Sequence, residues 1–169
     1  MNVLIEEADI KLKVQDIGRQ INSEYRDKKP IMIGVLKGAF MFLADLLREI
    51  DIPVEVDFLS IHSYDGNESS GVVRITHDLS LNIKGRDVIL VEDVIDTGRT
   101  VSYILENLRT RKPRSLAVCS LLNKKERRLV DVPLTFVGFA IPSLFVVGYG
   151  LDYDNRYRNL KYIGVLDDK

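Results

Sequence analysis

The chain has 169 residues, of which 46% are hydrophobic and 29% charged, and its formal net charge is −1. This length accommodates one compact domain with a sizeable core, and the near-neutral charge disfavours a general attraction to nucleic acid or to an anionic membrane. Acidic residues interrupt the N-terminus before any apolar stretch begins, and a lone cysteine cannot form an internal disulfide, so we expect a cytoplasmic protein without a secretory signal.

Helical and strand patterns alternate along the chain. Apolar residues recur at helical spacing from Ile10 to Ile21, which predicts an amphipathic helix over residues 8–26. The elements predicted after it are a strand over 31–35, a helix over 40–50, strands over 54–62, 72–76 and 88–91, a helix over 101–109, and strands over 116–122, 136–141 and 146–149. Continuous apolar strands that alternate with helices predict an α/β fold whose mostly parallel sheet is covered on both faces.

Three carboxylates follow the apolar strand predicted over residues 88–91. Glu92 and Asp93 are adjacent, so they repel each other and lose hydration at the end of a buried strand. We therefore expect hydroxyl groups or Mg²⁺ to satisfy them; the alternative is a solvated loop tip. Asp96 follows three residues later and is a candidate general base or acid.

The turn Thr97-Gly98-Arg99-Thr100 comes next and leads into a predicted helix. Its backbone N–H groups and the helix N-terminus can cradle a phosphate, Gly98 permits a tight turn, and the two threonines offer hydroxyl donors. An ordinary helix cap formed by Thr100 is the alternative. The chain lacks the glycine patterns of P-loop and dinucleotide-binding proteins, and ligands of parallel sheets gather at the carboxyl ends of the strands, where this turn lies.

The order of apolar strand, two acidic residues, two apolar residues and Asp-Thr-Gly-x-Thr over residues 88–100 resembles the phosphoribosyltransferases that use phosphoribosyl pyrophosphate. Residues 31–165 further resemble the bacterial type of hypoxanthine-guanine phosphoribosyltransferase, through residues 122–124, 139–142, 145–153 and 156–158. The resemblance implies a type I phosphoribosyltransferase fold: a twisted, mostly parallel sheet with flanking helices. It also implies a single domain over residues 1–169 with a small hood, formed by the N-terminal segment and residues 140–169.

The implied reaction is the Mg²⁺-dependent transfer of 5-phosphoribosyl from phosphoribosyl pyrophosphate to N9 of hypoxanthine or guanine, which yields IMP or GMP plus pyrophosphate in purine salvage. A xanthine-preferring enzyme is an alternative, because recognition of a 6-oxo group leaves position 2 open. An RNA-binding regulator on the same fold and a binding protein with a vestigial site fit the charge and the intact motifs less well. We expect small-molecule partners, neither nucleic acid nor membrane, and a homodimer or homotetramer, as is general in the family.

The resemblance also implies roles for the residues of the central motif. Glu92 and Asp93 would clamp the ribose hydroxyls and, together with Asp152, hold Mg²⁺. Asp96 would be the catalytic residue, beside the N7 side of the purine. The residues implied to bind the 5′-phosphate are Asp96, Thr97, Gly98, Arg99 and Thr100.

The implied purine pocket is formed by Lys124, Phe145, Val146 and Asp152. Phe145 would stack on the base, and Val146 would contact its edge through the backbone. Lys124 would donate to the 6-oxo group, which favours hypoxanthine or guanine over adenine. Without the resemblance, Phe145 reads as a core residue and Lys124 as one charge of a solvated loop.

Two further segments are implied to close the site. Leu36, Lys37 and Gly38 match a pyrophosphate-binding loop, in which the Leu36–Lys37 peptide is expected to be cis in some states, and Arg158 would bind the pyrophosphate oxygens. Ser63 and Tyr64 begin a polar stretch, residues 63–71, that matches a mobile loop closing over the site. Closure would exclude water from the activated sugar.

Overall fold

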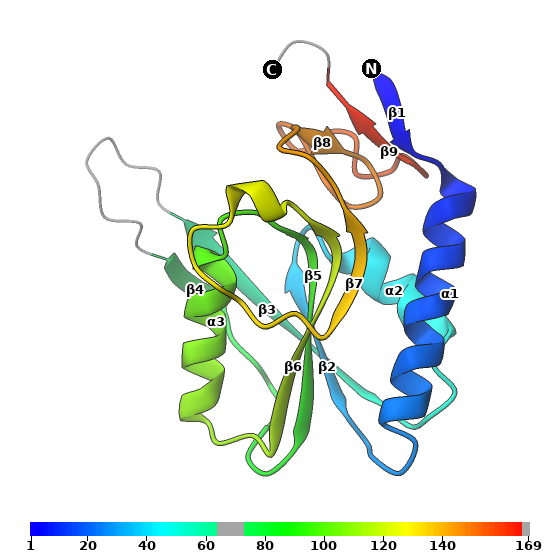
Figure 1. Ribbon diagram of the computed structural model, residues 1–169. Helices are drawn as coiled ribbons and strands as arrows, with labels where there is room; N and C mark the ends of the chain where they lie inside the picture. The colour runs from blue at the N-terminus through cyan, green and yellow to red at the C-terminus, as the bar shows by residue number, and fades with distance from the viewer. Residues whose placement is uncertain (64–72, 167–169) are drawn as a thin grey trace.

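The computed structural model describes residues 1–63 and 73–166, which form a six-stranded sheet flanked by helices and a separate three-stranded sheet (Figure 1). In chain order the elements are β1 (Asn2–Ile5), α1 (Glu7–Glu24), β2 (Ile31–Leu36), α2 (Phe40–Arg48), β3 (Glu55–Ser63), β4 (Val73–His77), β5 (Asp87–Ile95), α3 (Arg99–Thr110), β6 (Ser115–Asn123), the short 3₁₀ helix η1 (Lys125–Arg127), β7 (Phe136–Ala140), β8 (Val146–Val147) and β9 (Ile163–Val165). In this part of the chain no helix is long and apolar enough to cross a membrane.

The large sheet has the strand order β4-β3-β2-β5-β6-β7. Five of its strands run parallel, namely β3, β2, β5, β6 and β7, and β4 returns antiparallel beside β3. At the ends of the strands, Leu36 pairs with Ser60, and Ile95 pairs with Asn123. The carboxyl ends of the central strands therefore meet at one edge, which confirms the mostly parallel α/β sheet expected from the sequence.

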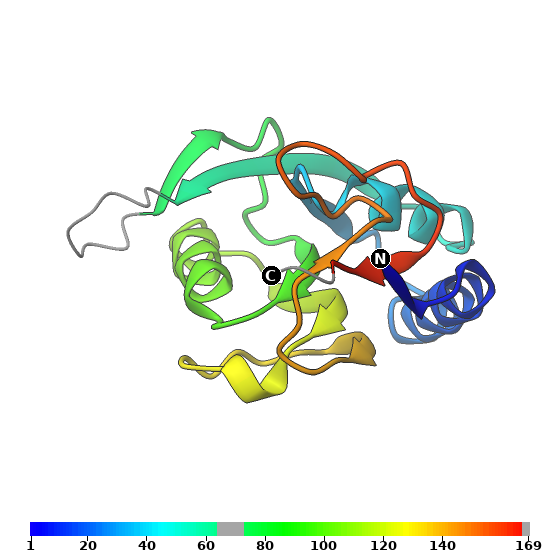
Figure 2. The same cartoon turned by 90° about the horizontal axis from the view of Figure 1, so that it is seen from above.

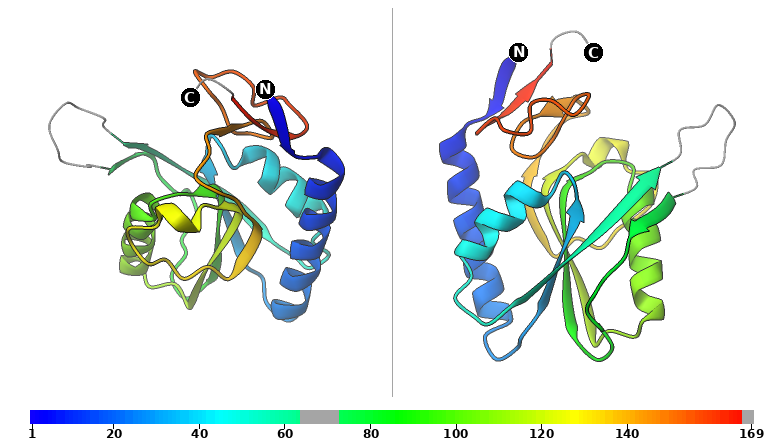
Figure 3. Two further views of the ribbon diagram at one scale, coloured as in Figure 1. Left: turned by 45° about the horizontal axis from the view of Figure 1, so that its top comes forward. Right: turned by 180° about the vertical axis from the view of Figure 1, so that it is seen from behind.

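Helices cover both faces of this sheet, with α1 and α2 on one side and α3 on the other (Figure 1 and Figure 3). Successive side chains of a strand point to opposite faces. In β5, Ile89 and Val91 accordingly pack into the core beneath α1 and α2, while Val88 and Leu90 pack beneath α3. This double burial explains why β5 is a continuous apolar run rather than an alternating one.

The three-stranded sheet, in the order β1-β9-β8, joins both ends of the chain and lies above the carboxyl ends of the large sheet (Figure 2). Asn2 pairs with Val165, and Val146 pairs with the same residue from the other side. The hydroxyl of Tyr149 donates to Asp45 Oδ2 of α2 over 2.7 Å and ties this part to the rest of the protein. This arrangement confirms the small hood formed by the termini.

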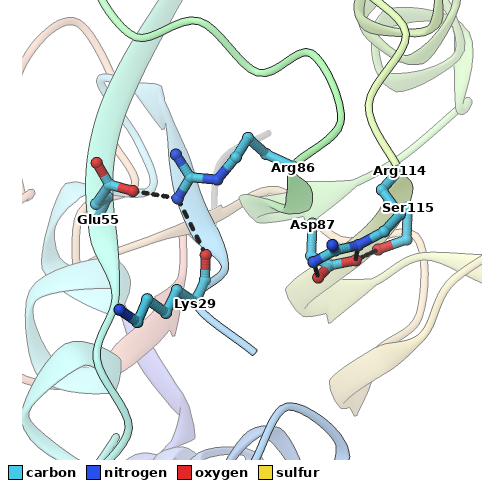
Figure 4. Close-up of polar contacts among 6 residues, drawn as sticks. All are labelled: Lys29, Glu55, Arg86, Asp87, Arg114 and Ser115. Atoms are coloured by element: carbon cyan, nitrogen blue, oxygen red, sulfur yellow. Dashed lines mark hydrogen bonds and ion pairs between the residues drawn. The ribbon is translucent and has the colours of Figure 1, made fainter. Parts of the chain in front are cut away.

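Polar contacts join the chain segments at the opposite end of the sheet, where β3, β5 and β6 begin (Figure 4). The residues in contact are Lys29, Glu55, Arg86, Asp87, Arg114 and Ser115. Asp87 is buried, forms an ion pair with Arg114 and accepts a hydrogen bond from Ser115 Oγ over 2.6 Å. Hydrogen bonding by Arg114 lowers the pKa of Asp87 to about 2.

The structure corrects two expected strands. The strand expected over residues 88–91 extends to Ile95, so that Glu92 and Asp93 belong to β5 instead of following it, because Val94 and Ile95 continue the pairing with β6. The strand expected over residues 146–149 ends at Val147, since Gly148 and Tyr149 both have positive φ angles and turn the chain.

Candidate active site

Two adjoining cavities lie at the carboxyl ends of β2, β5 and β6. The loop cavity, of about 250 Å³, is lined mainly by residues 92–98, 100 and 101. The hood cavity, of about 610 Å³, extends from Lys37 and Lys124 to residues 143–146 and to Arg158. The two cavities share Gly38, Asp93, Val94 and Asp96, so one elongated ligand can occupy both.

The loop cavity is built around the N-terminus of α3. This helix begins at Arg99 with Gly98 as its N-cap, at a φ of 85°, and no side chain caps it. The Thr100 cap considered from the sequence is therefore not formed. The Arg99 N–H donates to Thr97 Oγ1 over a long 3.4 Å. The N–H groups of the first turn point toward the start of the helix and favour an anion there.

Residues 128–130 hold this turn in place through hydrogen bonds to its backbone carbonyls. The carbonyl of Thr97 accepts hydrogen bonds from the N–H groups of Leu129 and Val130, at 2.9 and 3.0 Å. Arg128 Nε donates to the Asp96 carbonyl over 3.2 Å. The segment after β6 thus sets the position of the turn at the end of β5.

Glu92 is buried, and Asp93 is partly buried. Burial, with the charge of Asp93 as a smaller contribution, raises the pKa of Glu92 well above its ordinary value. Burial also raises the pKa of Asp93 to about 6, although the Val94 N–H donates to its Oδ1 over 2.7 Å. Gly38 lies against Asp93 so closely that any side chain there would collide with the carboxylate. The contacts of these carboxylates do not offset their burial, and hydroxyl groups or a cation can supply the remainder.

Asp96 lies between two cations from one turn. Lys124 Nζ is 3.7 Å from Asp96 Oδ2, and Arg127 Nε is 3.1 Å from Oδ1. Oδ1 is covered from solvent, yet it accepts no hydrogen bond from the described residues, because the Arg127 N–H is not aligned with it. Lys124 is itself buried, and this burial lowers its pKa.

The hood adds an aromatic face and a charged pair. Phe145 is 42% exposed, lines the hood cavity and contacts Tyr153 in a T-shaped arrangement, with ring centroids 5.7 Å apart. Arg158 Nη2 lies 2.7 Å from Asp152 Oδ1, and its Nη1 donates to the Gly150 carbonyl. The Leu36–Lys37 peptide is cis, and Lys37 lines the same cavity.

Residues 5–154 match the model of the phosphoribosyl transferase domain family. The chain is 50% identical to the hypoxanthine phosphoribosyltransferase of Salmonella typhimurium, over 97% of this chain and 94% of the relative. It is also 50% identical to the hypoxanthine-guanine phosphoribosyltransferase of Bacillus subtilis, over 97% of this chain and 92% of the relative. The chain belongs to the hypoxanthine phosphoribosyltransferase family.

Solved structures of the same family share the whole architecture. A hypoxanthine-guanine phosphoribosyltransferase from Bacillus anthracis has a TM-score of 0.92 at 41% identity and covers 98% of both chains. A hypoxanthine phosphoribosyltransferase from Staphylococcus aureus has a TM-score of 0.93 at 44% identity, covering 98% of this chain and 90% of that one. These relatives confirm the type I phosphoribosyltransferase fold.

Most of the site residues expected for a hypoxanthine phosphoribosyltransferase line one or both cavities. They are Leu36, Lys37, Gly38, Glu92, Asp93, Asp96, Thr97, Gly98, Thr100, Lys124, Phe145, Val146, Asp152 and Arg158. Arg99 lines neither cavity, since it begins α3 and is exposed. Tyr64 and the remainder of the expected closing loop lie outside the described residues, as does the side chain of Ser63.

The expected magnesium ligands are only partly assembled. Asp93 and Asp152 both line the hood cavity, whereas Glu92 lines the loop cavity alone. Among residues 1–63 and 73–166, no three His, Cys, Asp or Glu side chains lie together closely enough to hold a metal. A pair of carboxylates nevertheless suits Mg²⁺, which keeps several waters and takes other ligands from a bound phosphate.

The sequence reasoning missed Arg127, Arg128 and Tyr153. The two arginines lie in a charged run, residues 124–128, that has the composition of a solvated loop. The 3₁₀ turn η1 brings them back toward Asp96, a contact for which the sequence carries no signal. Tyr153 lies within the recognised 145–153 segment, but its contact with Phe145 depends on the fold of the hood.

Proposed function

We propose that the protein transfers the 5-phosphoribosyl group of phosphoribosyl pyrophosphate to N9 of hypoxanthine or guanine, with IMP or GMP and pyrophosphate as products. The observation that carries the proposal is the pair of joined cavities, in which a phosphate-sized cradle at α3 adjoins buried carboxylates and a purine-sized, partly aromatic space. The relatives named for hypoxanthine and guanine transfer support the same reaction.

The loop cavity would hold the phosphorylated end of the sugar. The N–H groups and hydroxyls of residues 96–100 would bind the 5′-phosphate at the N-terminus of α3. Glu92 and Asp93 would accept hydrogen bonds from the ribose hydroxyls, which relieves their buried charge. Binding energy from these remote groups fixes the anomeric carbon for attack.

The pyrophosphate end would lie at the Leu36–Gly38 loop and Arg158; Lys37, Gly38 and Arg158 all line the hood cavity. Asp93 and Asp152, together with Glu92, would hold Mg²⁺. At these residues, Mg²⁺ would supply positive charge that offsets the charge developing on the pyrophosphate. Backbone amides of the loop and the Arg158 guanidinium orient this leaving group.

The purine would occupy the remainder of the hood cavity. A flat base would stack face to face on the partly exposed ring of Phe145, with Val146 beside its edge. Lys124 would donate to the 6-oxo group, which adenine lacks. The unsatisfied Oδ1 of Asp96 would accept a hydrogen bond from the N7 side of the base as the purine loses a proton.

The remaining proposals concern the whole protein. Residues 1–169 would act as one phosphoribosyltransferase domain in which the terminal segments form a hood over the base, and residues 63–71 would close over the sugar. We further propose a homodimer or homotetramer located in the cytoplasm. Equilibrium sedimentation tests the assembly independently of the activity.

Steady-state rates with hypoxanthine, guanine, xanthine and adenine, each with phosphoribosyl pyrophosphate and Mg²⁺, test the proposed reaction. We expect kcat/KM for hypoxanthine or guanine to exceed that for adenine by about 100-fold or more, because adenine leaves the Lys124 donor unpaired. A higher kcat/KM for xanthine would support the xanthine-preferring alternative. Retention of RNA on filters without nucleotide synthesis would contradict the enzymatic proposal.

A further inference from the structure

We propose that Arg127 is a positioning residue for Asp96, which it holds in place when Lys124 turns to the base. The inference rests on the proposed function, in which Asp96 meets the N7 side of the purine and Lys124 meets the 6-oxo group. Neither the motif over residues 88–100 nor the purine-pocket motifs include Arg127. Its assignment comes from its contact with Asp96.

The two cations project from one short turn. Arg127 donates its backbone N–H to the Lys124 carbonyl over 3.1 Å, and η1 sets the spacing of their side chains. Lys124 Nζ then approaches Oδ2 of Asp96, and Arg127 Nε approaches Oδ1. The carboxylate of Asp96 is thereby held from both sides in the ligand-free protein.

A bound 6-oxopurine changes this balance. Lys124 has one ammonium group, so its donation to the 6-oxo group weakens its 3.7 Å contact with Asp96. Arg128 cannot replace it, because its guanidinium donates to Asn123 Oδ1 and to the Asp96 backbone carbonyl. Within the described part of the chain, Arg127 is then the remaining cation beside the Asp96 carboxylate.

The contact suits a positioning role. Arg127 Nε lies 3.1 Å from Oδ1, but the N–H is not aligned for a hydrogen bond, so the oxygen keeps its capacity to accept one from the purine. The attraction between the charges still restricts the rotation of the carboxylate. Arg127 also lines the hood cavity, and a direct contact with pyrophosphate is the competing role that an experiment must separate.

A double-mutant cycle on the full chain makes this separation, using Arg127→Gln, Asp96→Asn and the double variant. We expect Arg127→Gln to lower kcat about 10-fold, which is a fraction of the rate enhancement that a positioned acid or base supplies. The KM for phosphoribosyl pyrophosphate should stay within about two-fold of the wild-type value. In the Asp96→Asn background, the same substitution should change kcat less than about two-fold, because the two residues act as one unit. Arg127→Lys should restore part of the lost rate.

Lys125→Gln is the matched control, since Lys125 is an exposed cation of the same turn and lines neither cavity. Equal losses from Arg127→Gln in both backgrounds, or a raised KM for phosphoribosyl pyrophosphate, would overturn the positioning role. An unchanged kcat for Arg127→Gln would overturn it as well. Wild-type kcat in Asp96→Asn alone would instead remove the catalytic role proposed for Asp96, which distinguishes the two failures.

Discussion

Lys124 shows how burial gives one residue of a charged run a distinct chemistry. It is 6% exposed, whereas its neighbours Lys125 and Glu126 are exposed. Burial lowers its pKa, and the nearby charge of Asp96 opposes this change. A largely desolvated ammonium group that lines the hood cavity is a strong donor to a carbonyl, because its burial limits competition from water.

Replacing Lys124 with alanine should weaken base binding selectively. We expect the KM for hypoxanthine and guanine to rise about 10- to 100-fold, the value of a hydrogen bond from a charged group, while the KM for phosphoribosyl pyrophosphate stays within about two-fold. Steady-state kinetics with each substrate varied in turn measure both values. Lys125→Ala serves as the control, and a base KM unchanged in Lys124→Ala would contradict the pocket assignment.

At the scale of elements, the junction between β5 and α3 depends on a segment more than 30 residues away. Thr97 and Asp96 are held through their carbonyls by residues 128–130, and Gly98 fits against the same segment. A Cβ at Gly98 would lie 2.5 Å from the Val130 carbonyl and 2.9 Å from Arg128 Cδ. Gly98 is needed both for its φ of 85° and for this close approach.

Gly98→Ala should therefore impair both folding and phosphate binding. We expect the free energy of unfolding to fall by about 1–3 kcal/mol from the strained backbone, with a further loss from the collision. The KM for phosphoribosyl pyrophosphate should rise about 10-fold or more as the amide cradle shifts. Urea unfolding and steady-state kinetics measure these effects.

Gly85→Ala separates strain from site geometry. Gly85 also has a positive φ, of 69°, but a Cβ there meets nothing within 4 Å. The Gly85→Ala substitution should lower the free energy of unfolding by about 1–3 kcal/mol without changing the KM for the base or for phosphoribosyl pyrophosphate. Equal kinetic effects from the two alanine substitutions would argue against a specific phosphate cradle at Gly98.

The molecule as a whole places unlike carboxylates at the two ends of its sheet. At the carboxyl end, burial outweighs the favourable contacts of Glu92 and Asp93 and raises their pKa values. At the amino end, Arg114 and Ser115 lower the pKa of the buried Asp87 (Figure 4). The buried carboxylate at the amino end is thus paired with a cation, whereas the two carboxylates with raised pKa values lie at the end where a ligand would bind.

Asp87→Asn should reduce stability in a pH-dependent way. Because folding lowers the pKa of Asp87 from 3.8 to about 2, its charge stabilises the folded state above pH 4, and this contribution is lost as the pH falls toward 2. We expect the variant to lose about 1–2 kcal/mol at pH 7, a value reduced by the exposure of Arg114, and the difference should shrink below pH 4. Urea unfolding across this range, with exposed Asp27→Asn as the control, measures it; a pH-independent difference would contradict the charge assignment.

Local patterns in the sequence were sufficient to predict much of the fold and to locate the central motif. The predicted helices and the strands of the large sheet agree with α1 to α3 and β2 to β7 to within a few residues, except that β5 is longer. The short strands β1 and β9 were missed, because each has too few residues for a period and depends on a partner at the other end of the chain. Those strands complete the hood.

By itself, the sequence determined the alternation of strands and helices, the position of the acidic pair and the phosphate turn, and the family to which the chain belongs. These features are local, since they depend on the spacing of residues that are neighbours along the chain. Tertiary structure alone decided that Arg127 reaches Asp96, that Lys124 is buried, and that Arg128 supports the turn. Such contacts and burial depend on the packing of segments distant in sequence, where several arrangements satisfy the same local pattern.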